Sequence, residues 1–555
     1  MPTVTLNRKV FEKLVGKKLP TEKLKDRISM LGTDLEEVNK EEIIVEVFPN
    51  RPDMLSEQGF ARAFSSFIGS KKGLKKYNVK KSSYKVKVDA SMKNVRPNTA
   101  CAIIKNMKFD NEKIREVIQI QEKLHVTYGR NRKKAAIGIY PMEKIKMPIT
   151  FTAMKGEKIR FRPLESEKEM TGNEILNKHP TGRDYAHLLE GMQKYPIFID
   201  ANNEILSMPP IINSHNTGRI NERTKDVFIE CSGFDQDVLN KCLNILVTAM
   251  ADMGGEIYSM EVVYGSKKIT TPDLKPREMK LDLDYANKVL GLELKQKDIK
   301  DYLEKMGFGF ANGKVLVPAY RTDILHEMDL VEDIAIAYGY ENFEPEIPNV
   351  TTTGEEESFE AFCHKVARFM VGLKLIETST YHLINKADVG RNMNMAANAI
   401  ELENPLNAEY NVLRNWMIPS LMCVLGNNKH YEYPQNLFEI GTVFEHDNNA
   451  ESNVSEFKRM GVVLCDKEAD YTQIRQVLDA LMNALGLGFE VKSAVHKSFI
   501  DGRVGRVSCE GKNIAYIGEI NPIVLENYEL KMPIAALEIN MTELFGILKK
   551  KGDIK

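Results

Sequence analysis

The stretch "YRTDILHEMDLVEDIAIAYGY", residues 320–340, gathers carboxylates within eleven positions, at Asp323, Asp329, Glu332 and Asp333. The last three fall at i, i+3 and i+4, so on a helix they share one face. Like charges at that spacing destabilise an isolated helix by a few tenths of a kcal/mol per pair. The pattern therefore requires a compensating group, which is bulk water, a partner's arginines or a cation.

Two interpretations of this acidic helix are compatible. Asp329 followed by Glu332 is close to a capping box, and carboxylates in a first turn face the positive end of the helix dipole. Alternatively, Mg²⁺ takes oxygen ligands and is often held by one or two carboxylates plus water. Asp323, six residues upstream of Asp329, would then close onto the same face.

Bulk composition indicates a soluble, multidomain globular protein. The 555 residues carry 77 basic and 78 acidic side chains, so contact with nucleic acid requires a local patch and not an overall field. Seven scattered cysteines with no CxxC pair favour reduced, buried thiols over disulfides or a zinc site. No apolar signal region and no run approaching about 18 apolar residues is present, so we expect a cytoplasmic chain without a membrane partner.

Patterning along the chain predicts an α+β organisation. Residues 71–87 hold eight lysines and no acid, which is typical of a solvated linker. Residues 195–213, "YPIFIDANNEILSMPPIIN", predict a hairpin, and residues 281–310 predict two short helices. From residue 355, an amphipathic helix over 358–374 precedes apolar strands separated by helices, which suggests a mostly antiparallel sheet.

Two segments of the chain have the same order of predicted elements and residue types. "VFPNRPDMLSEQGFARAF" (47–64) and "VPAYRTDILHEMDLVEDIAIAYG" (317–339) each run strand, proline, arginine, aspartate, apolar pair and acid-bearing helix. Because strand–turn–helix joints commonly use Pro and Asp, we interpret the echo as a similar joint and not as proof of duplication.

Several motifs in order resemble one enzyme family along nearly the whole chain. They are "VFPNRPDMLSEQGFARAF", "MPPIINS" (208–214), "TKDVFIECSGFD" (224–235), "YRTDILHEMDLVEDIAIAYGYENF" (320–343), and "LENPLNAEYNVLRNWMIPSLM" (402–422) with "PQNLFEIGTVF" (434–444). Together they resemble the β subunit of phenylalanine–tRNA ligases in its archaeal and eukaryotic form.

The resemblance implies a domain order, a metal and partners. The expected parts are an N-terminal domain with the basic linker (1–88), a B3/B4 editing domain (89–267), a helix-turn-helix-like B5 domain (268–346) and a class II synthetase-like domain (352–555). The family's Mg²⁺ ligands match Asp323, Asp329, Glu332 and Asp333. The implied partners are an α subunit in an (αβ)₂ heterotetramer and tRNA(Phe), with ATP as a substrate of the assembled ligase.

The synthetase-like domain is expected to be catalytically silent. Class II cores hold ATP phosphates with arginines, and lysine does not replace a bidentate guanidinium. Here Arg414 is followed by no arginine until Arg459, and none occurs after Arg506. The chemistry of aminoacylation is therefore expected in the α partner, and helix 358–374 is a candidate for contact with it, or else an ordinary core helix.

Proofreading is the second expected chemistry. A hydrophobic pocket cannot strongly exclude tyrosine, which merely adds a hydroxyl to phenylalanine, so a second site that accepts the hydroxyl is useful. The resemblance aligns the tyrosine-selecting acid with Glu230, and Ser232 lies two residues on and so on the same strand face. His215 and Asn216 are further candidates for this pocket. With no evident nucleophile, hydrolysis would use a positioned water.

A basic turn within the same domain is a candidate for contact with tRNA phosphates. "YGRNRKKAAIGIY", residues 128–140, offers Arg130, Arg132, Lys133 and Lys134. A solvated turn is the common alternative. At the level of the whole chain, the alternative to an enzyme subunit is a non-catalytic tRNA-binding adaptor descended from one.

Overall fold

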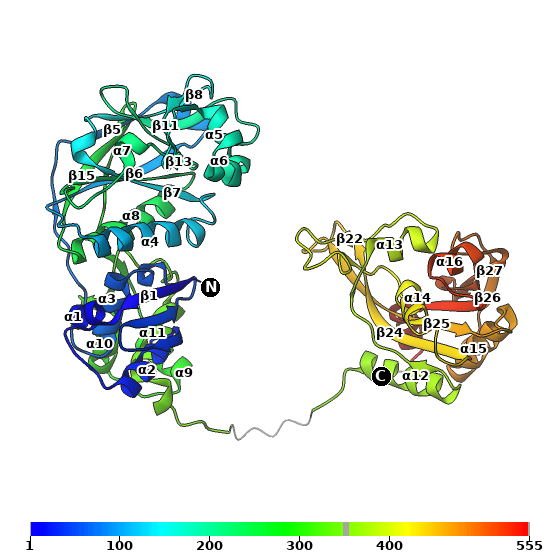
Figure 1. Cartoon of the computed structure of the whole chain (residues 1–555). Helices are drawn as coiled ribbons and strands as arrows, with labels where there is room; N and C mark the ends of the chain where they lie inside the picture. The colour runs from blue at the N-terminus through cyan, green and yellow to red at the C-terminus, as the bar shows by residue number, and fades with distance from the viewer. Residues whose placement is uncertain (1, 348–353, 553–555) are drawn as a thin grey trace. The chain divides into compact units, whose positions relative to one another are not determined.

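The computed structural model describes residues 2–347 and 354–552. The chain forms two compact units, Met1–Ile347 and Pro348–Lys555, and each is described here by itself (Figure 1). The expected start of the last domain at residue 352 lies outside the described residues. Among the described residues no helix is long and apolar enough to span a membrane. All seven cysteines are free and six of them are buried, as the sequence predicts.

The first unit begins with a small module of three strands and three helices, the N-terminal module. Its antiparallel sheet has the order β1-β3-β2. Alternating apolar residues bury Val4 and Leu6 in β1, and the Asn7 side chain then caps α1 by accepting from the backbone N–H groups of Lys9 and Val10. The elements are β1 (Thr3–Asn7), α1 (Arg8–Val15), α2 (Thr21–Met30), β2 (Asp34–Val38), β3 (Glu42–Glu46) and α3 (Glu57–Phe67).

A second module with the same topology, the acidic-helix module, closes the first unit. Its sheet order β17-β19-β18 repeats that of the N-terminal module element for element. The bounds are β17 (Arg277–Met279), α9 (Leu283–Leu290), α10 (Gln296–Lys305), β18 (Gly309–Ala311), β19 (Lys314–Val317) and α11 (Glu327–Tyr338). The similarity between the two sequence segments therefore extends beyond the strand–turn–helix connection to the element order of the whole module.

The repeated Arg-x-Asp loops form the same contact in both modules. Arg51 donates from Nε and Nη2 to the two carboxylate oxygens of Asp53, at 2.9 Å each. Arg321 donates in the same way to Asp323, at 2.8 and 2.7 Å. Both arginines are buried, so each loop supplies the bidentate partner that a buried guanidinium requires.

The middle module lies between these repeats and is built on an 11-stranded sheet. Its path runs β13-β12-β11-β8-β5-β15-β6-β14-β7, with β14 between β6 and β7. The helices α4 and α8 pack together on one face of the sheet near β6, β7 and β14 (Figure 1). The predicted hairpin is confirmed, since β11 and β12 pair antiparallel.

The elements of the middle module have the following bounds. The strands are β4 (Val79–Lys80), β5 (Lys85–Val88), β6 (Asn98–Lys105), β7 (Ala135–Pro141), β8 (Ile149–Met154), β9 (Arg160–Phe161), β10 (Met170–Thr171), β11 (Tyr195–Ile199), β12 (Ile205–Met208), β13 (Ile212–Asn213), β14 (Val227–Gly233), β15 (Glu256–Tyr264) and β16 (Lys267–Thr271). The helices are α4 (Asn111–Val126), α5 (Gly172–Lys178), α6 (Pro180–Tyr185), α7 (His215–Gly218) and α8 (Gln236–Asp252).

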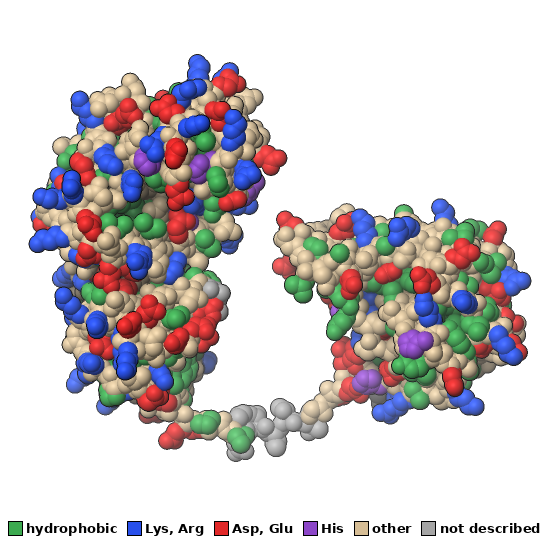
Figure 2. All heavy atoms as spheres, in the orientation of Figure 1, with side chains coloured by type: hydrophobic (Ala, Val, Ile, Leu, Met, Phe, Trp, Pro, Cys, Tyr) green, Lys and Arg blue, Asp and Glu red, His purple; other side chains and the backbone are tan. Residues whose placement is uncertain are grey.

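The lysine-rich segment 71–87 joins the N-terminal module to the middle module, and all its lysines are exposed, but its backbone and some of its charges are held by contacts. It supplies β4 and β5, both parallel to β15. Lys72 pairs with Asp301 at 2.6 Å and Lys75 with Asp252 at 2.7 Å. Because the acids that neutralise the lysines are about 180 to 230 positions away, local composition could not reveal them. Over the surface of the first unit, both signs of charge are interspersed (Figure 2).

The second unit carries a seven-stranded sheet of order β20-β24-β25-β29-β28-β27-β26, antiparallel except for the β20–β24 pair, as the sequence predicts. Its strands are β20 (Ile376–Glu377), β21 (Leu383–Ile384), β22 (Ile400–Glu401), β23 (Val412–Leu413), β24 (Gln435–His446), β25 (Val454–Cys465), β26 (Glu490–Ser493), β27 (Phe499–Cys509), β28 (Lys512–Ile520) and β29 (Ile534–Asn540). Its helices are α12 (Ser358–Gly372), α13 (Lys386–Val389), α14 (Ile418–Asn427), α15 (Tyr471–Ala484), α16 (Pro522–Asn527) and α17 (Met541–Lys551).

Helix α12 uses its apolar face inside this unit. Phe362, Val366 and Met370 are buried in one cluster with side chains of the sheet and of α15 and α17. Of the two interpretations of residues 358–374, the ordinary core helix is the correct one, because that face is not free for a partner.

Replacing Arg321 by leucine should destabilise the first unit strongly. Asp323 and Asp333 would lose the guanidinium that neutralises both, and removal of one partner from a buried ion pair costs about 3–5 kcal/mol. Urea denaturation monitored by circular dichroism should show the lower stability. The control Lys314→Met breaks an exposed pair with Glu278 and should cost less than about 1 kcal/mol. Equal midpoints for the two variants would contradict the buried-pair argument.

Candidate functional site

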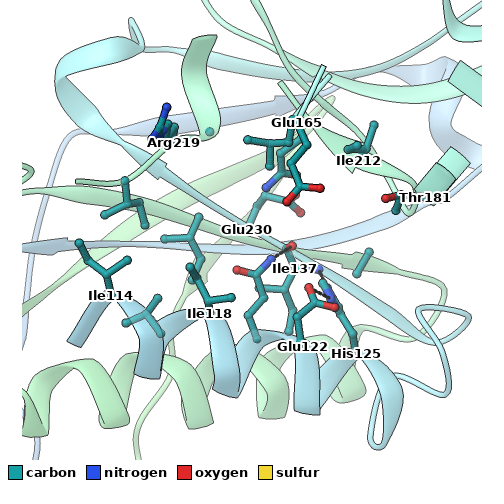
Figure 3. Close-up of a pocket in the computed structure, with 18 of the residues that line it drawn as sticks. Ile114, Ile118, Glu122, His125, Ile137, Glu165, Thr181, Ile212, Arg219 and Glu230 are labelled. Atoms are coloured by element: carbon teal, nitrogen blue, oxygen red, sulfur yellow. Dashed lines mark hydrogen bonds and ion pairs between the residues drawn. The ribbon is translucent and has the colours of Figure 1, made fainter. Parts of the chain in front are cut away.

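A cavity of about 1010 Å³ opens in the middle module beside strand β14, the neighbour of the terminal strand β7. Figure 3 shows its layers, with Ile114, Ile118 and Glu122 of α4 on one side and Glu165 and Ile212 on the other. Glu230 lies between them. Because β14 is paired on both edges and buried on both faces, its side chains are held rigidly at this depth.

Glu230 is the buried acid of this cavity. Its side chain accepts from the Tyr140 hydroxyl at 3.2 Å on Oε1, and the same hydroxyl lies 3.3 Å from Oδ1 of Asn213. Directly across from Glu230 on β7 stands Gly138. A Cβ there would come within 2.5 Å of Glu230 Oε1 and 2.1 Å of the Tyr140 oxygen, so this position must remain a glycine.

The second carboxyl oxygen of Glu230, Oε2, differs from the first in its hydrogen bonding. Oε2 is buried and has no hydrogen-bond partner among the described residues. Burial raises the pKa of Glu230 to about 8, although the Tyr140 hydroxyl and the Arg96 guanidinium act in the opposite direction. The cavity therefore presents a carboxyl group that is largely protonated at neutral pH and can form a hydrogen bond with a further hydroxyl.

Of the other predicted pocket residues, Ser232 lies beside Glu230 on the same strand face. It is fully buried and accepts from Arg96 Nε at 3.2 Å, and its hydroxyl acts against burial in lowering the pKa of Glu230, although Ser232 is not among the described lining residues of the cavity. His215 begins the short helix α7 and Asn216 is exposed, and neither is among the lining residues. The turn of α7 brings Gly218 and Arg219 to the cavity in their place.

A charged network on one wall was missed by the sequence analysis. His125 accepts from the Ile137 N–H through Nε2 at 2.8 Å and contacts Glu122 through Nδ1 at 3.1 Å. Arg132 pairs with Glu122 at 3.1 Å. Burial would raise the pKa of Glu122, but His125 and Arg132 outweigh it and lower that pKa to about 2. The i, i+3 spacing of Glu122 and His125 on α4 was the available signal.

The four predicted tRNA-binding cations divide into two kinds. Arg130, Lys133 and Lys134 are exposed in the turn that follows α4. Arg132 is largely buried, lines the cavity, donates to the Ile211 carbonyl at 2.8 Å and stacks on Tyr185. Its role is therefore to fix the wall of the cavity, and the other three are the side chains open to a phosphate.

Three of the four carboxylates predicted to bind Mg²⁺ already accept hydrogen bonds within the chain. Asp323 and Asp333 share Arg321, each at 2.7 Å from Nη2. Asp329 accepts from the N–H groups of Leu325 and His326, and Glu332 is exposed. A divalent ion would have to compete with a resident guanidinium.

The capping prediction also needs a correction. Helix α11 starts at Glu327 with His326 as its N-cap, so Asp329 is the N3 acid of the capping box and not the cap itself. Elsewhere, the described residues that bring carboxylate oxygens within 4.8 Å of one another are Asp34, Glu36 and Glu46, largely exposed on β2 and β3.

Arg414 of the second unit is fully buried and internally satisfied. It pairs with Glu439 at 2.8 Å and donates to the Thr442 carbonyl and the Thr380 hydroxyl, both at 2.8 Å. Gly441 makes room for it, since a Cβ there would lie 2.2 Å from Arg414 Nη2. This arginine is thus not free to hold a phosphate.

Comparison with known proteins matches three family models in order. They are the B3/4 domain over residues 84–245, the tRNA synthetase B5 domain over 279–340, and the phenylalanyl tRNA synthetase beta chain CLM domain over 344–541. A crystallised N-terminal fragment of the phenylalanyl-tRNA synthetase beta subunit from Pyrococcus horikoshii is 41% identical, with a TM-score of 0.58. The alignment covers 61% of this chain and 99% of the fragment.

Full-length relatives extend the match to the whole chain. The phenylalanine–tRNA ligase beta subunit of Pyrococcus horikoshii is 40% identical over 98% of this chain and 100% of its own length. That of Archaeoglobus fulgidus is 39% identical over 98% and 99%. With these similarities, the chain belongs to the family of phenylalanine–tRNA ligase β subunits.

Proposed function

We propose that this chain works with an α subunit in a cytoplasmic (αβ)₂ phenylalanine–tRNA ligase and hydrolyses mischarged Tyr-tRNA(Phe) in the cavity of its middle module. The assembled ligase would join L-phenylalanine to tRNA(Phe) with ATP. The observation that carries the proofreading role is Oε2 of Glu230, a buried acceptor without a partner among the described residues, in a cavity of about 1010 Å³.

The chemistry of selection follows from that oxygen. A tyrosyl group would place its phenol hydroxyl where Oε2 can accept, next to the Tyr140 phenol that already contacts Oε1. A phenylalanyl group would leave the buried oxygen unsatisfied, which costs about 1–3 kcal/mol. A site built to bond a hydroxyl rejects the analogue that lacks it much better than an apolar pocket rejects an added hydroxyl.

Hydrolysis itself is assigned to a water molecule. The described lining residues include no serine or cysteine, and the one hydroxyl side chain among them, Thr181, would need an adjacent general base to act as a nucleophile. The ester would therefore be attacked by a water positioned among the polar side chains of the lining.

Aminoacylation is assigned to the α partner. The internal pairing of Arg414 with Glu439 supports a silent synthetase-like unit that serves as a scaffold. A guanidinium that is committed to a buried carboxylate cannot stabilise the charge of a transferring phosphoryl group.

Glu230→Ala should reduce discrimination between Tyr-tRNA(Phe) and Phe-tRNA(Phe). Because Glu230 is largely protonated at neutral pH, loss of a neutral hydrogen bond of about 0.5–1.5 kcal/mol corresponds to a fall of roughly two- to tenfold in the ratio of the two hydrolysis rates. The measurement is deacylation of each radiolabelled tRNA by the assembled ligase. The matched control Glu165→Gln alters an exposed carboxylate of the same cavity and should leave the ratio unchanged. An unaltered ratio in Glu230→Ala would remove the selection role.

The same assay has a pH signature. As pH rises through about 8, Glu230 ionises and becomes a stronger acceptor, so the ratio should rise in the wild type. Taking the ratio cancels the base-catalysed hydrolysis common to both esters. In Glu230→Gln, which cannot ionise, the ratio should be flat with pH, and a persistent rise would assign the titration to another group.

The exposed cations of the turn should contribute to tRNA affinity by neutralising phosphates. Replacing both Lys133 and Lys134 by glutamine should flatten the plot of log K against log[salt] by about 0.7 for each phosphate that is no longer neutralised. Filter binding of tRNA(Phe) to the ligase measures this slope. The control pair Lys267→Gln and Lys268→Gln, on the exposed hairpin β15–β16, should leave the slope unchanged. Identical slopes in both double variants would leave only the solvated-turn interpretation.

The acidic helix should respond to substitution as a cap and not as a metal site. Asp329→Ala removes the acceptor for two N–H groups and should cost about 1 kcal/mol, equally in EDTA and in excess MgCl₂. Urea denaturation provides the measurement. Glu332→Gln is the control and should change nothing in either buffer, because Glu332 is exposed. A destabilisation that appears only with Mg²⁺ in both variants would restore the metal interpretation.

A further inference from the structure

A second cavity, of about 460 Å³, lies over the polar face of the seven-stranded sheet in the second unit. The strand register places Arg506, Tyr516 and Glu538 directly opposite one another on β27, β28 and β29. The next residue in this row is Gly461 on β25, which has no side chain. Met417 packs directly above Gly461, so the floor of the cavity is formed by the three side chains of Arg506, Tyr516 and Glu538.

Planar side chains form one wall. The ring centre of His496 lies 5.5 Å from that of Trp416 and 5.1 Å from that of Tyr516. The guanidinium carbon of Arg506 stands 4.0 Å from the Tyr516 ring centre. Burial, with the nearby Arg506, lowers the pKa of His496, so its imidazole is neutral at pH 7. Aromatic faces of this kind stack on another ring.

The polar groups of the cavity are incompletely satisfied. Asn415 Oδ1 and Arg459 Nε are buried and have no hydrogen-bond partner among the described residues. Arg459 is neutralised by Glu445 and Glu538 through its other nitrogens. Arg506 is different, because no carboxylate of the described chain pairs with it, and it is the cation of this cavity without a counter-charge.

We propose that this cavity binds a small ligand consisting of one aromatic or heteroaromatic ring and a single anionic group. The ring stacks against the wall formed by Trp416, His496 and Tyr516, and the anion pairs with Arg506. Two classes of molecule share this chemistry, the nucleoside monophosphates and the aromatic carboxylates. The site is independent of the Glu230 cavity, since all its residues belong to the second unit.

The sole tryptophan of the chain makes the proposal directly measurable. Because Trp416 is the one tryptophan in the sequence and lines the cavity, fluorescence of the full-length chain reports on this site alone. Titration with AMP and, separately, with L-phenylalanine should give a saturable change in Trp416 emission for at least one probe. A response to AMP assigns the nucleotide class, and a response to L-phenylalanine assigns the aromatic carboxylates.

Variants on one strand separate binding at Arg506 from a general effect. Arg506→Gln should weaken the apparent affinity about tenfold, and Arg506→Lys, which keeps the charge but not the planar fork, should weaken it less. Arg503→Gln is the matched control, because Arg503 is exposed and already pairs with Glu519. Circular dichroism of each variant verifies folding, with Arg506→Lys as the safeguard if Arg506→Gln unfolds. No saturable change with either probe, or equal affinity in wild type and both Arg506 variants, would overturn the proposal.

Discussion

Pairing between arginine and carboxylate determines which buried acids of this chain remain available. Arg321 neutralises Asp323 and Asp333 together, so these acids stabilise a loop and are not free ligands. Glu230 lacks such a partner. The nearby guanidinium of Arg96 acts on Glu230 through its charge, but its Nε and Nη2 groups donate hydrogen bonds to Ser232. An acid buried without a counter-ion has a raised pKa and an unsatisfied oxygen, and both properties suit the recognition of a hydroxyl.

The fold was largely predictable because its local signals agree with its tertiary contacts. The hairpin of β11 and β12 and the antiparallel sheet of the second unit follow from alternation and turn residues. The lysine run 71–87 is solvated as its composition suggests, but the acids that pair with Lys75 and Lys72, Asp252 and Asp301, are distant in sequence. Composition describes a segment alone, whereas the pairing of its charges depends on partners that only the folded chain brings together.

Prediction of the site was limited in the same way. Glu230 was identified through the family resemblance, but Tyr140, which occupies one of its oxygens, comes from a different strand. The pairing of β7 with β14 creates that contact, and no spacing rule within one segment reports it. The acidic helix also depends on a contact from outside its own segment. Its clustered acids suggested a cation, and the cation that neutralises Asp333 is Arg321, a residue of the loop that precedes the helix.

The packing of Arg414 and the position of the cavity in the second unit have one physical origin. Two neighbouring positions on β24 and β25 are glycines, Gly441 and Gly461. The side chains of Arg414 and Met417 fill the space that side chains at these positions would occupy. That inward packing commits Arg414 to Glu439, which removes a phosphate-binding group from the face. By contrast, β27 and β28 carry the side chains of Arg506 and Tyr516 on this face. The face in which Arg414 is committed to a carboxylate therefore has a cation that no described carboxylate pairs with, Arg506, and an aromatic wall at its other end, a combination suited to a small anion.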